Sequence, residues 1–221
     1  MAGTDSPDPI ANAVLSPQAS LVVRHLLQAA LGNSDGLKDP EKNLARGLLA
    51  NVLMNDVLNG WNEAGQPEWQ QAQNLVGQVL PGTPPDSPDP NLAMAYHARG
   101  LVKRTAQPTA TTPPDPDGAL KDFQQAVTQD PSFARGHAQV GNQIALNGHP
   151  ENSHEHFKNA RTLSPNHPAM GYFDWAEGRA YYLEKNWVCA VKWLQQSVNE
   201  LTTVSYNKKY LALAQQHVTN P

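Results

Sequence analysis

The sequence predicts an all-α fold, and three observations lead to this prediction. Along most of the chain, apolar residues recur every three or four positions, which is the spacing of one face of an α-helix. Strand signals are almost absent, because no alternating run of Val, Ile and Thr extends beyond a few residues. The middle of the chain also repeats itself at a shift of 34 residues, a period typical of helical repeat proteins.

The first two predicted helices have clear start signals. Ser16-Pro17 places a capping hydroxyl before a proline at the first helical position, and apolar residues follow at helical spacing up to Gly32. The tripeptide Asp39–Glu41 repeats this signal, and the apolar pattern behind it predicts a long helix that runs to Trp61.

The prolines predict two loops. Nine of the 19 prolines fall between Pro81 and Pro116, in two separate tracts. Proline lacks a backbone N–H and clashes with the preceding helical turn, so neither tract can form the interior of a helix. We therefore expect proline-rich, exposed loops at residues 81–91 and 105–117.

The internal repeat can be followed from residue to residue. At a shift of 34, Ala119 aligns with Ser153, Phe123 with Phe157, Ala126 with Ala160, and Pro131 with Pro165. At a shift of 37, Gly141 aligns with Gly178, Ser153 with Ala190, and Phe157 with Leu194. Earlier in the chain the spacing is longer, because the two proline-rich loops insert extra residues. The repeat and the distribution of prolines therefore agree.

This pattern resembles the tetratricopeptide repeat (TPR). In that family, position eight of the first helix is small so that the second helix can approach, a large residue on the second helix fills the groove, and Pro ends the unit. The cleanest copy here consists of Gly141, Ser153, Phe157, Ala160 and Pro165. The resemblance implies a right-handed α-α superhelix built from TPR-like helix hairpins.

The resemblance also divides the chain into three parts. Residues 1–15 are expected to be a flexible N-terminus. Residues 16–52 are expected to form N-terminal capping helices. Residues 53–218 are expected to form a TPR-like array of four units and a final helix, in which Ala212 holds the small position.

A narrower likeness rests on short stretches such as Ala134–Asn142, Leu163–Pro168 and Gly178–Leu183. They resemble repeat regions of bacterial class III adenylate cyclases and winged-helix regulators, in which the repeats follow an effector domain. Neither a cyclase domain nor a winged helix fits in the 221 residues of this chain. The likeness implies a bacterial signalling role in which the effector domain belongs to another part or another chain.

Composition excludes several classes of partner. The chain has 16 Lys and Arg against 20 Asp and Glu, so it has no general attraction to nucleic acid or to anionic membranes. No apolar run approaches the roughly 20 residues that span a bilayer. The N-terminus also lacks the basic start and apolar core of a secretory signal. We expect a cytoplasmic protein with no nucleic-acid or membrane partner.

No residue pattern predicts catalysis, a metal site or a cofactor. His154 and His156 lie near His149, but they are two positions apart on a predicted helix and therefore point to different sides. No HExxH motif or cysteine pair supports a zinc site. Cys189 is the single cysteine, and we expect it to pack as a small buried residue. The protein is expected not to be an enzyme and to have no cofactor.

The TPR resemblance places the concave face on positions two, five, nine and twelve of the first helices. The candidate peptide-binding groove comprises Arg104, Arg135, Asn142, Tyr172, Trp175, Arg179, Tyr182 and Lys209. The rows that hold these residues contain no acidic side chain, so the groove suits an extended or C-terminal peptide that bears carboxylates. In the alternative interpretation, the arginines bond to neighbouring helices.

The leading functional prediction is a non-catalytic protein–protein interaction scaffold that binds a peptide or protein segment in the concave groove. The alternative is a regulatory or sensory module of a bacterial adenylate cyclase or transcriptional regulator. The sequence leaves open the identity of the partner and the oligomeric state, a homo-oligomer included.

Overall fold

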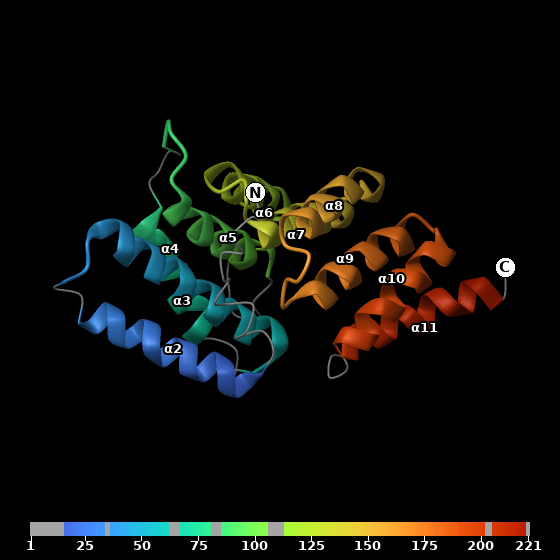
Figure 1. The fold of residues 1–221 in the computed structure, drawn as a ribbon, viewed down its shortest axis with the longest axis horizontal. Coiled ribbons are helices and arrows are strands. Elements are labelled where there is room, and N and C mark those ends of the chain that lie inside the picture. Colours follow the sequence, from blue (N-terminus) through green and yellow to red (C-terminus); the bar gives the residue numbers. More distant parts are fainter. Residues whose placement is uncertain are drawn as a thin grey trace. The chain divides into compact units, whose positions relative to one another are not determined.

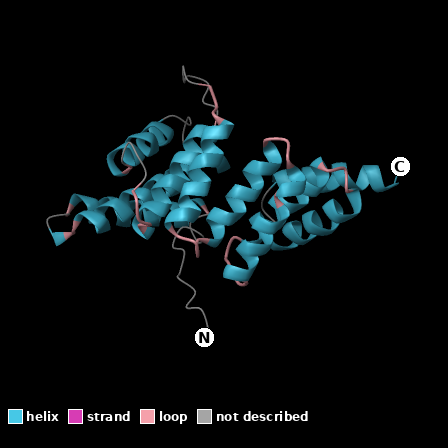
Figure 2. Ribbon diagram, turned by 90° about the horizontal axis from the view of Figure 1, so that it is seen from above, coloured by secondary structure: helices cyan, strands magenta, loops and turns pink. Residues whose placement is uncertain are grey.

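The computed structural model describes residues 16–33, 36–61, 67–80, 85–105, 113–201 and 205–219. Every regular element in these ranges is a helix, as Figure 2 shows, so the predicted all-α fold class is confirmed. The predicted N-terminal segment 1–15 lies outside the described residues. The chain divides into two compact units, residues 1–133 and residues 134–221.

In the part of the chain that the structure describes, the first unit is built from two helix hairpins and one additional helix (Figure 1). Its described helices are α2 (Pro17–Gly32), α3 (Asp39–Asn59), α4 (Pro67–Val79), α5 (Pro90–Arg104) and α6 (Pro116–Gln129). Helix α3 packs against α4, α5 packs against α6, and α2 packs against α3. The predicted boundary between residues 52 and 53 falls inside α3.

Among its described residues, the second unit is built from two hairpins followed by one more helix (Figure 1). Its described helices are α7 (Ala134–Leu146), η2 (Pro150–Asn152), α8 (His154–Leu163), α9 (Met170–Leu183), α10 (Trp187–Glu200) and α11 (Ser205–Thr219). Helix α7 packs against α8 and α9, and α10 packs against α9 and α11.

Asp-Pro pairs set the starts of α5 and α6. The Asp89 side chain accepts a hydrogen bond from the backbone N–H of Asn91, and Asp115 accepts one from Gly118 at 2.8 Å. In both helices the following proline occupies the first turn. The described residues before these caps are non-helical. The two loops therefore end at the caps, within the predicted ranges 81–91 and 105–117.

Two glycines allow the helices of a hairpin to touch. A Cβ atom at Gly100 of α5 would lie 2.5 Å from the ring of Phe123 on α6. At Gly178 of α9, it would lie 2.7 Å from Cγ of Leu194 on α10. Real Cβ atoms essentially never approach a neighbour this closely. The small residue at position eight of the repeat is therefore explained by a close helix–helix contact.

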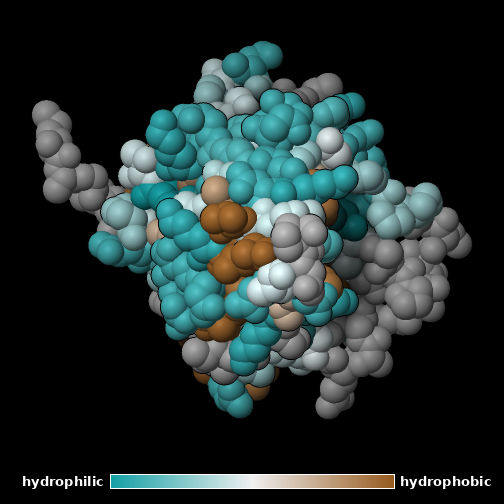
Figure 3. All heavy atoms as spheres, turned by 90° about the vertical axis from the view of Figure 1, so that its right-hand side faces the viewer, coloured by the Kyte–Doolittle hydropathy of each residue, from teal (hydrophilic) through white to brown (hydrophobic). Residues whose placement is uncertain are grey.

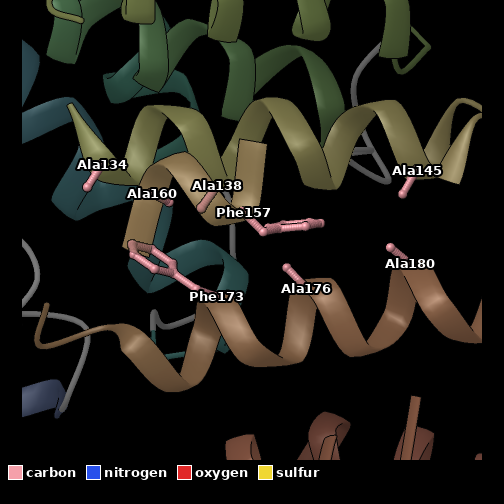
Figure 4. Packing of buried hydrophobic residues seen from close by; sticks show 8 residues of the cluster. All are labelled: Ala134, Ala138, Ala145, Phe157, Ala160, Phe173, Ala176 and Ala180. Atoms are coloured by element: carbon pink, nitrogen blue, oxygen red, sulfur yellow. The ribbon is translucent and has the colours of Figure 1, made fainter. Parts of the chain in front are cut away.

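Alanines and phenylalanines form a core in the second unit (Figure 4). The cluster comprises Ala134, Ala138 and Ala145 of α7, Phe157 and Ala160 of α8, and Phe173, Ala176 and Ala180 of α9. Alanines of α7 and α9 face each other, and Phe157 lies between these two helices. The alanines let the helices approach, and the rings fill the space that remains.

The surface is mostly hydrophilic on the side that Figure 3 shows. On the side of the molecule drawn in Figure 3, apolar residues gather near the middle of a mostly hydrophilic face. None of the described helices combines the length and the hydrophobicity that a membrane crossing needs.

Candidate peptide-binding surface

Helices α7 and α9 lie side by side and present the two central rows of the predicted groove. Residues three or four positions apart share one face of a helix, so Arg135, Ala138 and Asn142 follow one another along α7. On α9 the same spacing aligns Tyr172, Trp175, Arg179 and Tyr182. The two helices thus bring six of the eight predicted site residues into one unit.

A hydrogen-bond network joins the two rows. The Tyr172 hydroxyl donates to Oε1 of Gln139 at 2.9 Å and accepts from Nδ2 of Asn142 at 3.0 Å. Arg179 donates from Nη2 to Oδ1 of Asn142. Because Gln139 and Asn142 are almost completely buried, these bonds satisfy polar groups that water cannot reach. The network therefore fixes α7 against α9.

Aromatic rings continue this surface onto α10 and α11. We call the set Tyr172, Trp175, Tyr182, Trp187, Tyr210 and His217 the aromatic row. Tyr210 lies 6.3 Å from Trp175 and 5.5 Å from Tyr182, measured between ring centroids. Trp187 lies 5.2 Å from Tyr182 and stacks on His217 at 4.1 Å. All rings of the row except His217, which is exposed, are half-buried, so each keeps part of its surface open to solvent.

Two cationic residues of the predicted groove are buried rather than open to a ligand. Arg135 and Arg179 are only 6% and 8% exposed. The Arg179 guanidinium lies 4.2 Å from the ring centroid of Trp175, an arrangement that stabilises a cation over an aromatic face. The bond of Arg179 to Asn142 of α7 supports the alternative interpretation, in which an arginine binds the neighbouring helix, whereas the contact with Trp175 lies within α9.

Arg104 belongs to α5 of the first unit. Its guanidinium lies 5.5 Å from the ring centroid of Phe123, so it contacts the second helix of its own hairpin.

The predicted register of α11 is wrong by two residues. Ala212, expected at the small position, is exposed, whereas Ala214 is fully buried in a cluster with Ala190 and Leu194. Lys209 is exposed and does not occupy the fifth position. Tyr210 also contacts the rings of Trp175 and Tyr182, a contact that the sequence did not predict. Counting from Ala214 places Lys208 and Leu211 at positions two and five, so the corrected register alone would not have found Tyr210.

A second cluster of charged side chains joins α8 to α9 and α10. Arg161 of α8 forms ion pairs with Glu177 and, at 2.7 Å, with the fully buried Asp174. Its guanidinium also lies 4.1 Å from the ring centroid of Trp193. Burial raises the pKa of Asp174, although Arg161 opposes this shift. The sequence reading did not find this cluster.

His154 extends the cluster at the start of α8. Its Nε2 lies 2.5 Å from Oε1 of Glu184, its Nδ1 lies 3.7 Å from Oε1 of Glu177, and its ring stacks on Tyr181. The interaction with Glu177 raises the pKa of His154 most, partial burial opposes it, and Glu184 raises it further. The two carboxylates therefore stabilise the protonated, cationic form of the His154 ring.

His156 and Cys189 have surroundings different from those of His154. His156 faces His137, with ring centroids 6.1 Å apart, and burial followed by this neighbour lowers the pKa of His156. His154 and His156 thus point to different sides, as predicted. Within the described ranges, no group of three or more His, Cys, Asp or Glu side chains is placed to hold a metal ion. Cys189 is half-buried rather than buried, so that prediction is wrong.

Comparison with known proteins identifies the fold. No protein-family profile matches the chain, and no curated protein matches it. The crystal structure of a thermophilic TPR protein from Thermus thermophilus superposes with a TM-score of 0.56 and 17% sequence identity, over 91% of this chain and all of the other. The chain has a TPR-like fold. The narrower likeness to cyclase and winged-helix regulator repeats stays a prediction.

Proposed function

We propose that the chain is a non-catalytic scaffold that binds an extended, carboxylate-bearing segment of a partner protein on the aromatic row of its second unit. The TPR-like fold supports protein binding in general. The observation that carries the finer proposal is a row of rings, mostly half-buried, that are already held in place by other contacts. Such rings offer apolar surface without a large loss of side-chain freedom on binding.

Charge supports the preference for carboxylates. Helices α7 and α11 contain no acidic residue, and α11 exposes Lys208 and Lys209 beside Tyr210. The acids of α9, Asp174 and Glu177, pair with Arg161 of the other cluster. A peptide on the aromatic row therefore meets positive groups and no acid from α7 or α11. The cytoplasmic location and the regulatory alternative stay predictions from the sequence.

Paired tryptophan variants test the proposal. An array of acidic peptides, each printed also with Asn and Gln in place of Asp and Glu, would identify a binding sequence. Trp187→Ala should weaken binding of that peptide at least about tenfold, or about 1.4 kcal/mol. Trp193→Ala is the matched control, because this ring covers Arg161 in the other cluster, and it should leave affinity unchanged. Equal loss in both variants, or equal binding of neutral peptides, would reject the proposal.

A further inference from the structure

Three rings of the aromatic row meet at steep angles. Tyr182 of α9 lies 5.2 Å from Trp187 of α10 and 5.5 Å from Tyr210 of α11, measured between ring centroids. The ring planes meet at 67° and 85°, and all three side chains are half-buried. Rings in this edge-to-face arrangement form a stepped surface, whereas stacked rings form a flat one. We call these three residues the ring corner.

The polar groups of the ring corner are open to a ligand. In the part of the chain that the structure describes, the hydroxyls of Tyr182 and Tyr210 and the indole N–H of Trp187 take part in no hydrogen bond, and none of these atoms is completely buried. Tyr172 of the same row differs, because its hydroxyl bonds to Gln139 and Asn142. The ring corner therefore offers three hydrogen-bond donors together with half-buried apolar surface.

A partner can bond only to side chains at this surface. The regular elements among the described residues are helices, whose backbone groups bond within each helix, so they present no strand edge to which a partner strand could add. The side chains are mainly donors, because an indole and an ammonium group cannot accept, and Lys208 and Lys209 are exposed beside Tyr210. Helices α7 and α11 contribute no acidic residue. A matching partner segment must therefore supply hydrogen-bond acceptors.

We propose that the ring corner binds a proline-rich segment of a partner protein in the polyproline II conformation. This rests on the proposed function, because it names the residue type and the conformation of the segment that the aromatic row binds. Proline has no backbone N–H, and polyproline II has no internal hydrogen bonds, so the carbonyls of such a segment stay available to the three donors. Proline-rich segments also dock on aromatic side chains, and their restricted conformation lowers the entropy lost on binding.

A partner helix matches the ring corner less well. Its carbonyls already bond within the helix, so an apolar helix face would cover the three donors without giving them acceptors. Leaving a donor buried and unpaired costs free energy. Polyproline II has three residues per turn, so a repeat of Pro-Pro-Asp keeps its carboxylates on one edge and its prolines on the other two. The prolines can then contact the rings while the carboxylates face Lys208 and Lys209.

Peptides that differ in proline or in charge test the proposal. The probes are labelled peptides built from four repeats of Pro-Pro-Asp, Ala-Ala-Asp or Pro-Pro-Asn, and fluorescence anisotropy measures their binding to the full chain. The Pro-Pro-Asp peptide should bind at least about tenfold more tightly than the Ala-Ala-Asp peptide, because only the former is held in polyproline II. Equal binding of these two, or no binding of the Pro-Pro-Asp peptide, would overturn the proposal.

The same peptides separate this proposal from the proposed function. Binding of Ala-Ala-Asp as tightly as Pro-Pro-Asp, with the Asn peptide weaker, would keep the preference for carboxylates and reject the preference for proline. Equal, tight binding of the two proline peptides, with Ala-Ala-Asp weaker, would support the preference for proline and reject the preference for carboxylates.

Removal of two hydroxyls tests the donors. Tyr182→Phe combined with Tyr210→Phe keeps both rings but should weaken binding of the Pro-Pro-Asp peptide about tenfold, because two hydrogen bonds to its carbonyls are lost. Tyr181→Phe is the matched control, since this ring stacks on His154 in the other cluster, and it should leave the affinity unchanged. Circular dichroism would check that each variant folds. A folded double variant that binds like the wild type would overturn the proposal.

Discussion

The contact between Gly178 and Leu194 shows how one missing methyl group determines a helix pair. An alanine would normally favour a helix over glycine by about 1 kcal/mol. At position 178, however, the added Cβ would lie 2.7 Å from Cγ of Leu194 and 3.0 Å from its backbone nitrogen. Backbone cannot move aside as a flexible side chain can, so the clash outweighs the gain in helix propensity.

We therefore predict that Gly178→Ala lowers the free energy of unfolding by about 1–3 kcal/mol, the usual range for overpacked cores. Gly77→Ala is the control, because Gly77 lies within α4, is exposed, and has no atom within 4 Å of the added Cβ. It should raise stability by about 0.5–1 kcal/mol. Urea denaturation would measure both changes. A neutral or stabilising Gly178→Ala would contradict the assigned contact.

His154 makes stability depend on pH. Its neighbours are Glu177, Glu184 and Tyr181, and Glu177 also pairs with Arg161. Because the carboxylates raise the pKa of His154 above its ordinary 6.5, the folded state favours the charged ring. Its contribution is fully present below about pH 6.5 and is lost as pH rises through the higher folded-state pKa.

We predict that stability falls above pH 6.5 in the wild type, and that His154→Gln removes most of this fall. His156→Gln is the control. Burial lowers the pKa of His156. The contribution of His156 to stability therefore changes only below pH 6.5, where stability falls as the pH falls. Urea midpoints between pH 6 and pH 9 would measure the effect. If His154→Gln and the wild type kept the same slope above pH 6.5, His154 would not be the responsible group.

At the scale of elements, a backbone hydrogen bond joins the two ends of the loop between α5 and α6. The N–H of Asp115 donates to the carbonyl of Lys103 at 2.8 Å, so the two ends of the loop are already adjacent. The repeat spacing treats residues 106–112 as an insertion. Removing them would leave Thr105 joined to Pro113, which still permits the bond between Lys103 and Asp115.

We predict that deletion of residues 106–112 leaves the Tm within a few degrees of the wild type, because closure entropy changes only slowly with loop length. Replacing the same seven residues with Gly and Ser gives a control of unchanged length. Differential scanning calorimetry would compare the three proteins. Loss of cooperative unfolding in both variants would show that this segment contributes packing.

The sequence predicts where helices lie better than it predicts which residue of a helix holds each repeat position, and α11 shows why. Proline marks the insertions at residues 81–91 and 105–117, so their lengths could be read. The connection from α10 to α11 contains no proline. Its two additional residues were therefore not counted, and the small position was predicted at Ala212 instead of Ala214. A one-dimensional count fails wherever a loop changes length without a residue that signals it.

The sequence predicted which helix faces form the candidate surface, but not which of their side chains are buried. Helical spacing placed Asn142, Tyr172 and Arg179 on facing rows, and the network confirms that they meet. Spacing cannot show that Arg179 folds over Trp175 and becomes buried. The cluster of Arg161 and Asp174 was missed because the bonds join separate helices, which no local motif records.

At the scale of the whole molecule, each unit has a core of its own. In the first unit, Ala95, Tyr96 and Ala126 belong to one buried cluster. In the second unit, Phe157 and Phe173 belong to another. Close glycine contacts occur in both units, among them Gly100 with Phe123 in the first and Gly178 with Leu194 in the second. A change at either glycine therefore perturbs one core directly.

We predict that the two units respond separately to these changes. In hydrogen exchange followed by mass spectrometry, Gly100→Ala should speed exchange in α5 and α6 while α9 and α10 keep their wild-type rates, and Gly178→Ala should do the reverse. The reason is that stability in repeat proteins is the sum of local units and nearest-neighbour contacts, so a local clash first raises the population of local openings. Faster exchange throughout the chain in both variants would show instead that the units unfold as one cooperative body.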